Sequence, residues 1–93
     1  MKAISPRRAG SFEPAVAAAF GEVIRTERVK KQIAQDAFAL IAGIDRSYYG
    51  KLERGERQPS IALLLRIASG LGCSASTLIR RLEAALGQIP PST

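Results

Sequence analysis

The sequence predicts an all-α domain of five helices, and three observations support this prediction. The chain has 93 residues, which is enough for one domain with a small core. Good helix formers dominate its apolar residues, and tryptophan is absent. Five stretches repeat apolar residues at the spacing of a helix, and proline, glycine or capping residues separate them.

The five helical patterns lie between two tails. Residues 1–12 show no periodicity and include three basic side chains, so they are predicted to form a flexible basic arm. Residues 88–93 contain two prolines, which favour a disordered tail. The folded domain is therefore expected over residues 13–87.

The first two helices are expected at about residues 14–31 and 35–42. Pro14 suits the first turn of a helix. Gly43 ends the second helix, because glycine readily adopts the left-handed conformation that closes a helix. The apolar face of the first helix comprises Val16, Phe20, Val23 and Ile24. That of the second comprises Phe38, Ala39 and Ala42.

The remaining three helices each follow a residue that caps helices well. The third is expected from Asp45 to about Arg54, the fourth after Ser60 and the fifth at about residues 74–87, from Ser74. The inward residues of the fourth helix are predicted to be Ile61, Leu64, Leu65, Ala68 and Leu71. The fifth carries Leu78, Ile79, Leu82 and Leu86.

The second and third helices, with the glycine turn between them, have the pattern of a helix-turn-helix. Ala39 is small enough for a close helix crossing, Gly43 allows the turn, and Ile44 fills the gap between the helices. Tyr49 and Leu52 are expected to anchor the third helix to the core. The outer face of that helix then consists of Arg46, Ser47, Tyr48, Gly50 and Lys51.

The side chains on this outer face suit the edges of base pairs, because a helix fits the major groove of DNA. Arg46 or Lys51 can hold guanine, and Ser47 can bond several base edges. Tyr48 can contact a thymine methyl group or a phosphate, or it can pack on the second helix instead. Gly50 would let the DNA backbone or neighbouring side chains come close. Outside this motif, the two cations would be ordinary solvated surface charges.

The overall charge favours a polyanionic partner. The chain has 14 Lys and Arg against 8 Asp and Glu, a formal net charge of +6, which suits nucleic acid or an acidic membrane surface. No apolar run approaches the roughly 20 residues that a membrane span needs. Cys73 is the single cysteine and cannot form a disulfide within the chain, so a cytosolic location is expected.

The same composition disfavours catalysis and metal binding. The chain has no histidine and no cluster of metal-ligand residues, and Cys73 has no neighbouring base. We therefore expect no enzymatic activity, no metal and no cofactor.

From Phe20 to about Leu78 the sequence resembles the Cro/repressor-type (XRE) helix-turn-helix family. The pieces that carry the resemblance, in order, are FGEVIR from Phe20 with Arg28 after it; Gln35, Phe38-Ala39 and Ala42-Gly43-Ile44; Ser47-Tyr48 and LERGERQPS from Leu52; and Leu64, Ile67-Ala68, LGCS from Leu71 and Leu78. The resemblance implies a five-helix, lambda-repressor-like fold and a DNA-binding transcriptional regulator that represses or activates transcription.

The resemblance also implies roles for individual residues. Gln35, Arg54 and Arg57 match positions that contact DNA phosphates. Arg28 and Glu53 match an ion pair that fixes the recognition helix against the first helix. With these residues placed, the base-contacting set remains Arg46, Ser47, Tyr48 and Lys51.

The sequence departs from the family pattern at the start of the second helix. Gln32 stands where the family usually has glycine, and Ala34 stands where a serine or threonine usually caps the helix. Ala34 cannot cap, so a backbone donor there needs another partner. Cys73 occupies a position that is usually apolar and buried, so a core thiol is expected. In the basic arm, Arg7 and Arg8 either reach a DNA minor groove or have no role.

The fifth helix carries a second apolar stripe. Ile79, Leu82 and Leu86 form a surface that a small domain does not readily bury, and relatives of this size dimerise in this region. An isologous homodimer is therefore predicted, with recognition helices roughly 34 Å apart on a pseudo-palindromic operator. The alternative is a monomer whose fifth helix packs fully inward.

Two interpretations of the function remain. The favoured one is a transcriptional regulator of double-stranded DNA, with a restriction–modification controller protein as the preferred subclass and RNA polymerase as a further candidate partner. The other is an antitoxin or adaptor whose main role is to hold a small protein partner.

Overall fold

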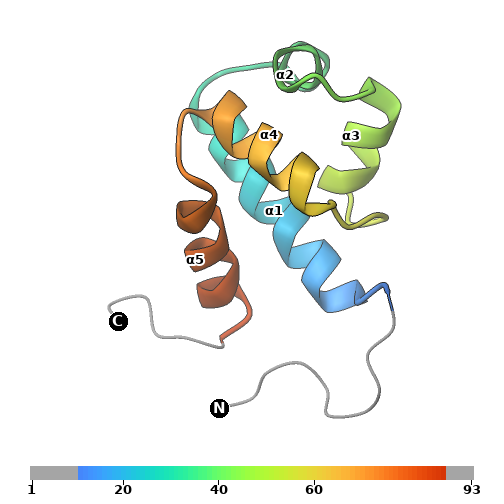
Figure 1. The fold of residues 1–93 in the computed structure, drawn as a ribbon, viewed down its shortest axis with the longest axis vertical. Coiled ribbons are helices and arrows are strands. Elements are labelled where there is room, and N and C mark those ends of the chain that lie inside the picture. Colours follow the sequence, from blue (N-terminus) through green and yellow to red (C-terminus); the bar gives the residue numbers. More distant parts are fainter. Residues whose placement is uncertain (1–10, 88–93) are drawn as a thin grey trace.

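The computed structural model describes residues 11–87, and within them the all-α prediction is confirmed. The predicted arm, apart from its last two residues, and the predicted tail at 88–93 lie outside these residues. The five helices are α1 (Pro14–Lys30), α2 (Gln35–Ala42), α3 (Arg46–Glu53), α4 (Ile61–Leu71) and α5 (Ala75–Ala85) (Figure 1). The predicted ends of α2 and the predicted start of α1 match these bounds, and the other predicted ends differ by at most two residues.

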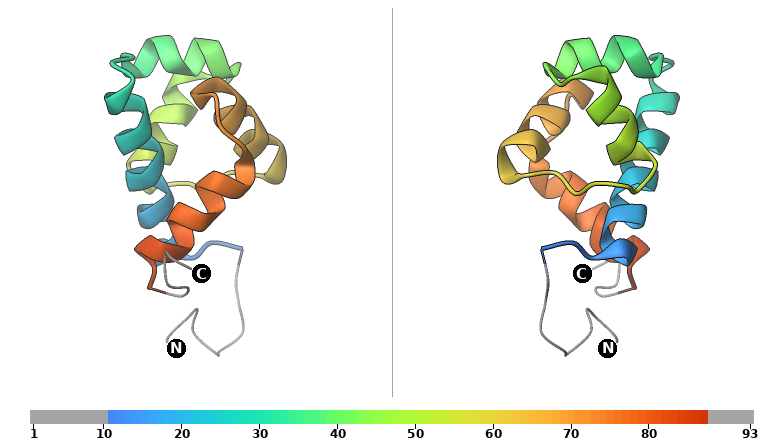
Figure 2. Two further views of the ribbon diagram at one scale, coloured as in Figure 1. Left: turned by 90° about the vertical axis from the view of Figure 1, so that its left-hand side faces the viewer. Right: turned by 90° about the vertical axis from the view of Figure 1, so that its right-hand side faces the viewer.

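The helices surround one apolar core. α1 packs against both α3 and α5, while α2 packs against α3 and α4. α2 and the start of α3 lie at the end of the domain opposite the start of α1 and the end of α5 (Figures 1 and 2). The largest fully buried side chains are Tyr49, Phe20, Phe38, Ile24, Leu52, Ile67, Leu71 and Leu78. The core therefore holds the helix-turn-helix at one end of the molecule.

Side-chain caps start three of the helices, as the sequence predicts. Asp45 accepts a hydrogen bond from a backbone N–H in the first turn of α3, at 3.0 Å. Ser60 does so for α4 and Ser74 for α5, both at 3.2 Å. Ala34, which precedes α2, makes no side-chain cap. The first backbone N–H groups of α2 are thus left without that partner.

The turn between α2 and α3 closes on Gly43. This residue has a φ of +70°, in the left-handed region that favours glycine. The next N–H, of Ile44, donates back to the carbonyl of Ala39 at 2.9 Å, and the Ile44 side chain is buried. Gln32, in the turn before α2, has a φ of +59°. The backbone there is left-handed, which explains why glycine suits this position.

Two of the five residues predicted to face inward from α4 are exposed instead. Ile61 is 73% exposed and Leu65 is 55% exposed, although both were expected to face inward. The buried set is Leu64, Ile67, Ala68 and Leu71, which follow the i, i+3, i+4, i+7 spacing of one helix face. Leu65 is one residue off that stripe, and Ile61 is the first residue of the helix.

Cys73 is half-buried rather than fully buried, which corrects the expectation of a core thiol. It follows Gly72, the left-handed residue that ends α4, and its side chain packs against the edge of the core. Its N–H donates to the carbonyl of Ala68 at 3.0 Å, which closes the helix.

Within residues 11–87 no helix is both long and apolar enough to cross a bilayer by itself. α4 and α5 reach the required length and composition only as a pair, and that pair is bent by 103°.

Gly21 lies inside α1 at the point where α1 meets the end of α3. A Cβ atom there would lie 2.6 Å from the carbonyl oxygen of Leu52, and closer still to that of Glu53. We expect Gly21→Ala to lower the free energy of unfolding by about 1–3 kcal/mol, because two backbones must separate. The change would outweigh the roughly 1 kcal/mol by which alanine favours a helix.

Urea unfolding of Gly21→Ala beside Gly70→Ala measures this effect. A Cβ atom at Gly70 meets the edge of the Phe38 ring at 3.0 Å, a side chain rather than backbone. We expect a smaller loss for this control. A Gly21→Ala protein as stable as the wild type would show that α1 and α3 do not touch here.

Candidate nucleic-acid interface

α3 presents one face to the core and the other to solvent. Tyr49 and Leu52 are fully buried, and the Tyr49 ring lies with its centroid 5.3 Å from that of Phe38 on α2. Arg46 and Ser47 are exposed at the start of the helix. The predicted base-contacting residues Tyr48 and Lys51 are half-buried. The buried side chains thus hold α3 from behind.

Gly50 is buried, which corrects its assignment to the outer face. A Cβ atom here would lie 3.0 Å from Nη1 of Arg54 and 3.4 Å from Oε1 of Gln35. The absence of a side chain thus leaves room for Arg54 and Gln35, two of the predicted phosphate contacts, beside the middle of α3.

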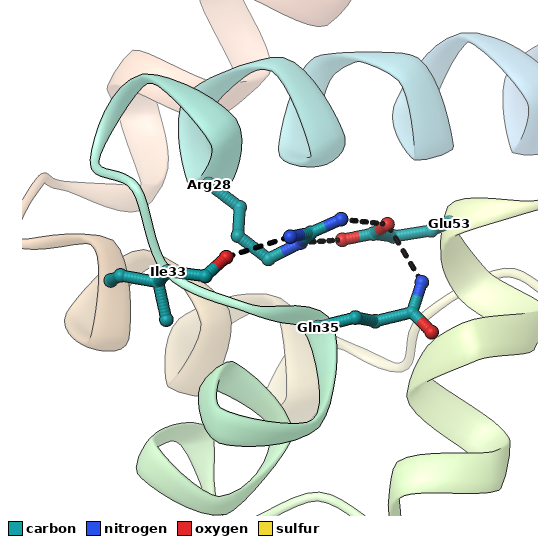
Figure 3. A network of polar contacts seen from close by, with 4 residues as sticks. All are labelled: Arg28, Ile33, Gln35 and Glu53. Carbon is teal, nitrogen blue, oxygen red and sulfur yellow. Dashed lines mark hydrogen bonds and ion pairs between the residues drawn. The ribbon is translucent and has the colours of Figure 1, made fainter.

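Arg28 and Glu53 form a buried ion pair between the last turns of α1 and α3 (Figure 3). Nε of Arg28 lies 2.6 Å from one carboxylate oxygen of Glu53, and Nη2 lies 2.9 Å from the other. Nη1 of Arg28 donates to the carbonyl of Ile33 at 2.7 Å. One arginine therefore joins the end of α1, the loop before α2 and the end of α3.

The protonation of Glu53 is set by these neighbours. Burial alone would raise the pKa of Glu53, but the hydrogen bonds from Arg28 and from the Gln35 amide favour the carboxylate and outweigh burial. The pKa of Glu53 is therefore held below its ordinary value. The hydrogen bond to Glu53 raises the pKa of Arg28, so both partners are charged at neutral pH.

The Tyr49 hydroxyl is buried beside this pair. Burial, followed by the neighbouring Glu53 carboxylate, raises the pKa of Tyr49 far above its ordinary value. Within residues 11–87 no atom is in hydrogen-bonding geometry with the Tyr49 oxygen. Tyr49 therefore supports α3 through the packing of its ring.

Gln35, a predicted phosphate contact, points at Glu53 in this structure (Figure 3). Its Nε2 donates to a carboxylate oxygen of Glu53 at 2.9 Å. Gln35 is also the first residue of α2, whose N-terminal N–H groups have no side-chain cap from Ala34. These groups and the amide of Gln35 together form a donor-rich helix end next to α3.

The other predicted phosphate contacts lie on the loop after α3. Arg54 Nε lies 3.0 Å from the carboxylate of Glu56, and Arg57 donates to the Glu56 carbonyl at 2.9 Å. The hydrogen bond from Arg54 lowers the pKa of Glu56. All three residues are exposed. These surface contacts are weak enough to exchange for another anion.

Gln58, in the loop after α3, makes hydrogen bonds to Tyr48 of α3 and to the residues just before α1, which the sequence did not predict. The Tyr48 hydroxyl donates to the Gln58 carbonyl at 3.5 Å, a contact that neither interpretation of Tyr48 included. The Gln58 amide accepts from the N–H of Glu13 and donates to the carbonyl of Ser11 at 3.0 Å. No local pattern marks the Gln58 side chain, because the partners of its amide group are more than 40 residues away in the sequence.

The predicted dimer residues on α5 are half-buried. Ile79 and Leu82 pack against the edge of the core and line a shallow groove of about 140 Å³, together with Val16, Phe20, Gln58 and Pro59. Leu86, the third residue of the predicted interface, follows the last residue of α5. The apolar stripe of Ile79, Leu82 and Leu86 is therefore partly packed against the domain and partly exposed.

Comparison with known proteins identifies the family of this helix-turn-helix fold. The model of the helix-turn-helix family HTH_3 matches residues 24–78. The control protein C.MunI from Mycoplasma sp is 35% identical over 65 residues, which are 69% of this chain and 88% of that protein.

Two solved structures are also similar. The restriction-modification controller protein C.AhdI from Aeromonas hydrophila is 36% identical with a TM-score of 0.67, over 69% of this chain and 97% of that chain. The controller protein C.Esp1396I, as a tetramer in complex with its natural 35 base-pair operator, is 27% identical with a TM-score of 0.72, over 80% of this chain and 97% of that chain. With α2 and α3 as its helix-turn-helix, this chain belongs to the HTH_3 family of Cro/C1-type DNA-binding transcriptional regulators.

Proposed function

We propose that this protein is a restriction–modification controller that binds a pseudo-palindromic operator as a homodimer. The observation that carries the proposal is the way α3 packs against the core and exposes its start. Its rear face is fixed by Tyr49, Leu52 and the buried Arg28–Glu53 pair, while Arg46 and Ser47 at its start are exposed. The similarity to C.MunI and C.AhdI supports the controller subclass.

Sequence selection in this proposal comes from α3 in the major groove. The side chains that would contact base edges are Arg46, Ser47, Tyr48 and Lys51. An arginine can donate two parallel hydrogen bonds to guanine, which no other base pair offers in the same pattern. The exposed first turn of α3 is the part that reaches deepest into a groove.

Phosphate contacts would position the dimer on DNA. Gln35 at the start of α2 and Arg54 and Arg57 after α3 flank the recognition helix on both sides. In the free protein these groups bond to Glu53 and Glu56, so DNA binding would exchange those partners for phosphate oxygens. Contacts of this kind fix the register of the protein and make binding depend on salt concentration.

The homodimer is proposed to form through α5, at Ile79, Leu82 and Leu86. We expect Leu86→Glu to raise the dimer dissociation constant by at least about tenfold, because a charge would be buried at the contact. Leu86 is the better target than Leu82, since Leu82 also packs against the core. Sedimentation equilibrium measures the change.

Leu65→Glu is the matched control for this variant. Leu65 is 55% exposed on α4 and lines a different groove, with Ile41 of α2. The control should keep the wild-type dimer, and far-UV circular dichroism should show that both variants are folded. A Leu86→Glu protein that dimerises normally would move the interface away from the end of α5.

Selection of bound fragments from a random pool of duplex DNA tests the proposed function itself. The proposal predicts an enriched site with two-fold symmetry and half-site centres about one helical turn, roughly 34 Å, apart. Enrichment of no sequence, or of a single asymmetric site, would contradict it. Copurification with a small protein in place of DNA binding would favour the adaptor hypothesis.

A further inference from the structure

Asp36 of α2 contacts Arg46 of α3, and sequence analysis gave Asp36 no role. Oδ2 of Asp36 lies 3.4 Å from Nη1 of Arg46. Both side chains are largely exposed, at 68% for Asp36 and 75% for Arg46. The carboxylate therefore sits beside the arginine that is proposed to contact a base.

We propose that Asp36 is a specificity-determining residue that directs Arg46 toward a base edge and away from phosphates. This inference rests on the proposed function, since it assumes that Arg46 contacts DNA. It adds a residue outside the recognition helix to the set that selects the sequence.

The geometry of the contact leaves Arg46 able to hold a base at the same time. Nη1 of the guanidinium faces Asp36, and the group carries five N–H donors in a planar fork. Among residues 11–87 the N–H groups of Nε and Nη2 have no hydrogen-bond acceptor, so they can donate to the two acceptors of guanine, O6 and N7. A carboxylate on one side of the fork restricts its rotation and so favours one approach to the groove.

The charge of Asp36 acts differently on a phosphate. A guanine edge is neutral, whereas a phosphate carries a full negative charge that the nearby carboxylate repels. Asp36 also competes with the phosphate for the same guanidinium. On DNA without the operator sequence, where phosphate contacts supply nearly all of the affinity, Asp36 therefore weakens binding. On the operator, the base contact remains available to Arg46.

The test compares Asp36→Asn with Glu22→Gln, which removes the same charge from an exposed position on α1. Each change is made in the wild-type protein and in an Arg46→Gln protein. Dissociation constants are measured over a range of salt concentrations on the selected operator and on a random duplex of equal length. Circular dichroism checks that each variant is folded.

We expect Asp36→Asn to tighten binding to the random duplex by about two- to fivefold, the size of an exposed ion pair. The slope of log affinity against log salt should steepen by about one phosphate contact. Operator binding should not tighten by the same factor, so the ratio of operator to random affinity should fall. Glu22→Gln should change neither the ratio nor the slope to this extent.

The Arg46→Gln background isolates the contact, since Asp36→Asn should have no effect on the ratio there. The inference is overturned if Asp36→Asn behaves like Glu22→Gln, or if its effect persists without Arg46. A wild-type protein that prefers no sequence would instead overturn the proposed function and this inference with it. A sequence preference that Asp36→Asn leaves unchanged would overturn the inference alone.

Discussion

Glu53→Ala is expected to lower the free energy of unfolding by about 3–5 kcal/mol. The substitution leaves the guanidinium of Arg28 buried without its carboxylate, and removes the acceptor of Gln35. Small domains have a total stability of about 5–15 kcal/mol, so this loss is a large share. Urea unfolding at pH 7 measures it directly.

A double replacement separates stability from positioning. In Arg28→Met/Glu53→Leu both charges are gone, and apolar pairs of similar volume often restore or exceed the original stability. We expect this protein to be close to wild type in stability yet weaker in operator binding, because Gln35 and the end of α3 lose their common anchor. A Glu53→Ala protein within about 1 kcal/mol of wild type would show that the pair is not buried in solution.

The same pair predicts how stability changes in acid. The pKa of Glu53 is lowered in the folded protein, so its contribution is fully present above the ordinary glutamate pKa of 4.5. The contribution is lost as pH falls below 4.5 and through the lower folded pKa. The difference in unfolding free energy between the wild type and Glu53→Gln should therefore shrink toward low pH.

Arg46→Ala is expected to weaken operator binding by about 1–3 kcal/mol per half-site, and so by up to about 6 kcal/mol for a dimer. The variant should also lose its preference at one base pair in each half-site. Stability should change little, because the Arg46 side chain is 75% exposed and its ion pair with Asp36 lies on the surface. Gel shifts on operators with single base-pair changes measure both effects.

Arg80→Ala provides the control, since it removes the same charge from an exposed position on α5. Its effect should be small and similar on every sequence. If Arg46→Ala weakens binding equally on all operators, Arg46 contacts phosphate rather than a base. The central role given to the first turn of α3 would then be wrong.

Local chemistry made much of the fold predictable. The cap at Asp45, the left-handed turn at Gly43 and the burial of Tyr49 and Leu52 all follow from neighbouring residues. The same holds for the missing cap at Ala34. In each case the residue type decides the conformation within one helical turn.

Contacts between distant segments escaped prediction. Gly21 lets the backbones of α1 and α3 approach closely, Gly50 makes room for Gln35 of α2, and Gln58 holds the start of α1. A glycine inside an alanine-rich helix was a signal for Gly21, because it weakens the helix without a local reason. Leu65 was misplaced because its neighbour Leu64 fits the same apolar pattern, and only packing decides between them.

We propose that the first turn of α3, backed by the start of α2, faces DNA. The most direct test is to titrate the isotope-labelled protein with its selected operator and to follow the backbone amide signals by NMR. The largest shifts are expected on residues 35–36, 46–51 and 54–57. Shifts concentrated on α5 and the outer face of α1, with α3 unchanged, would contradict it.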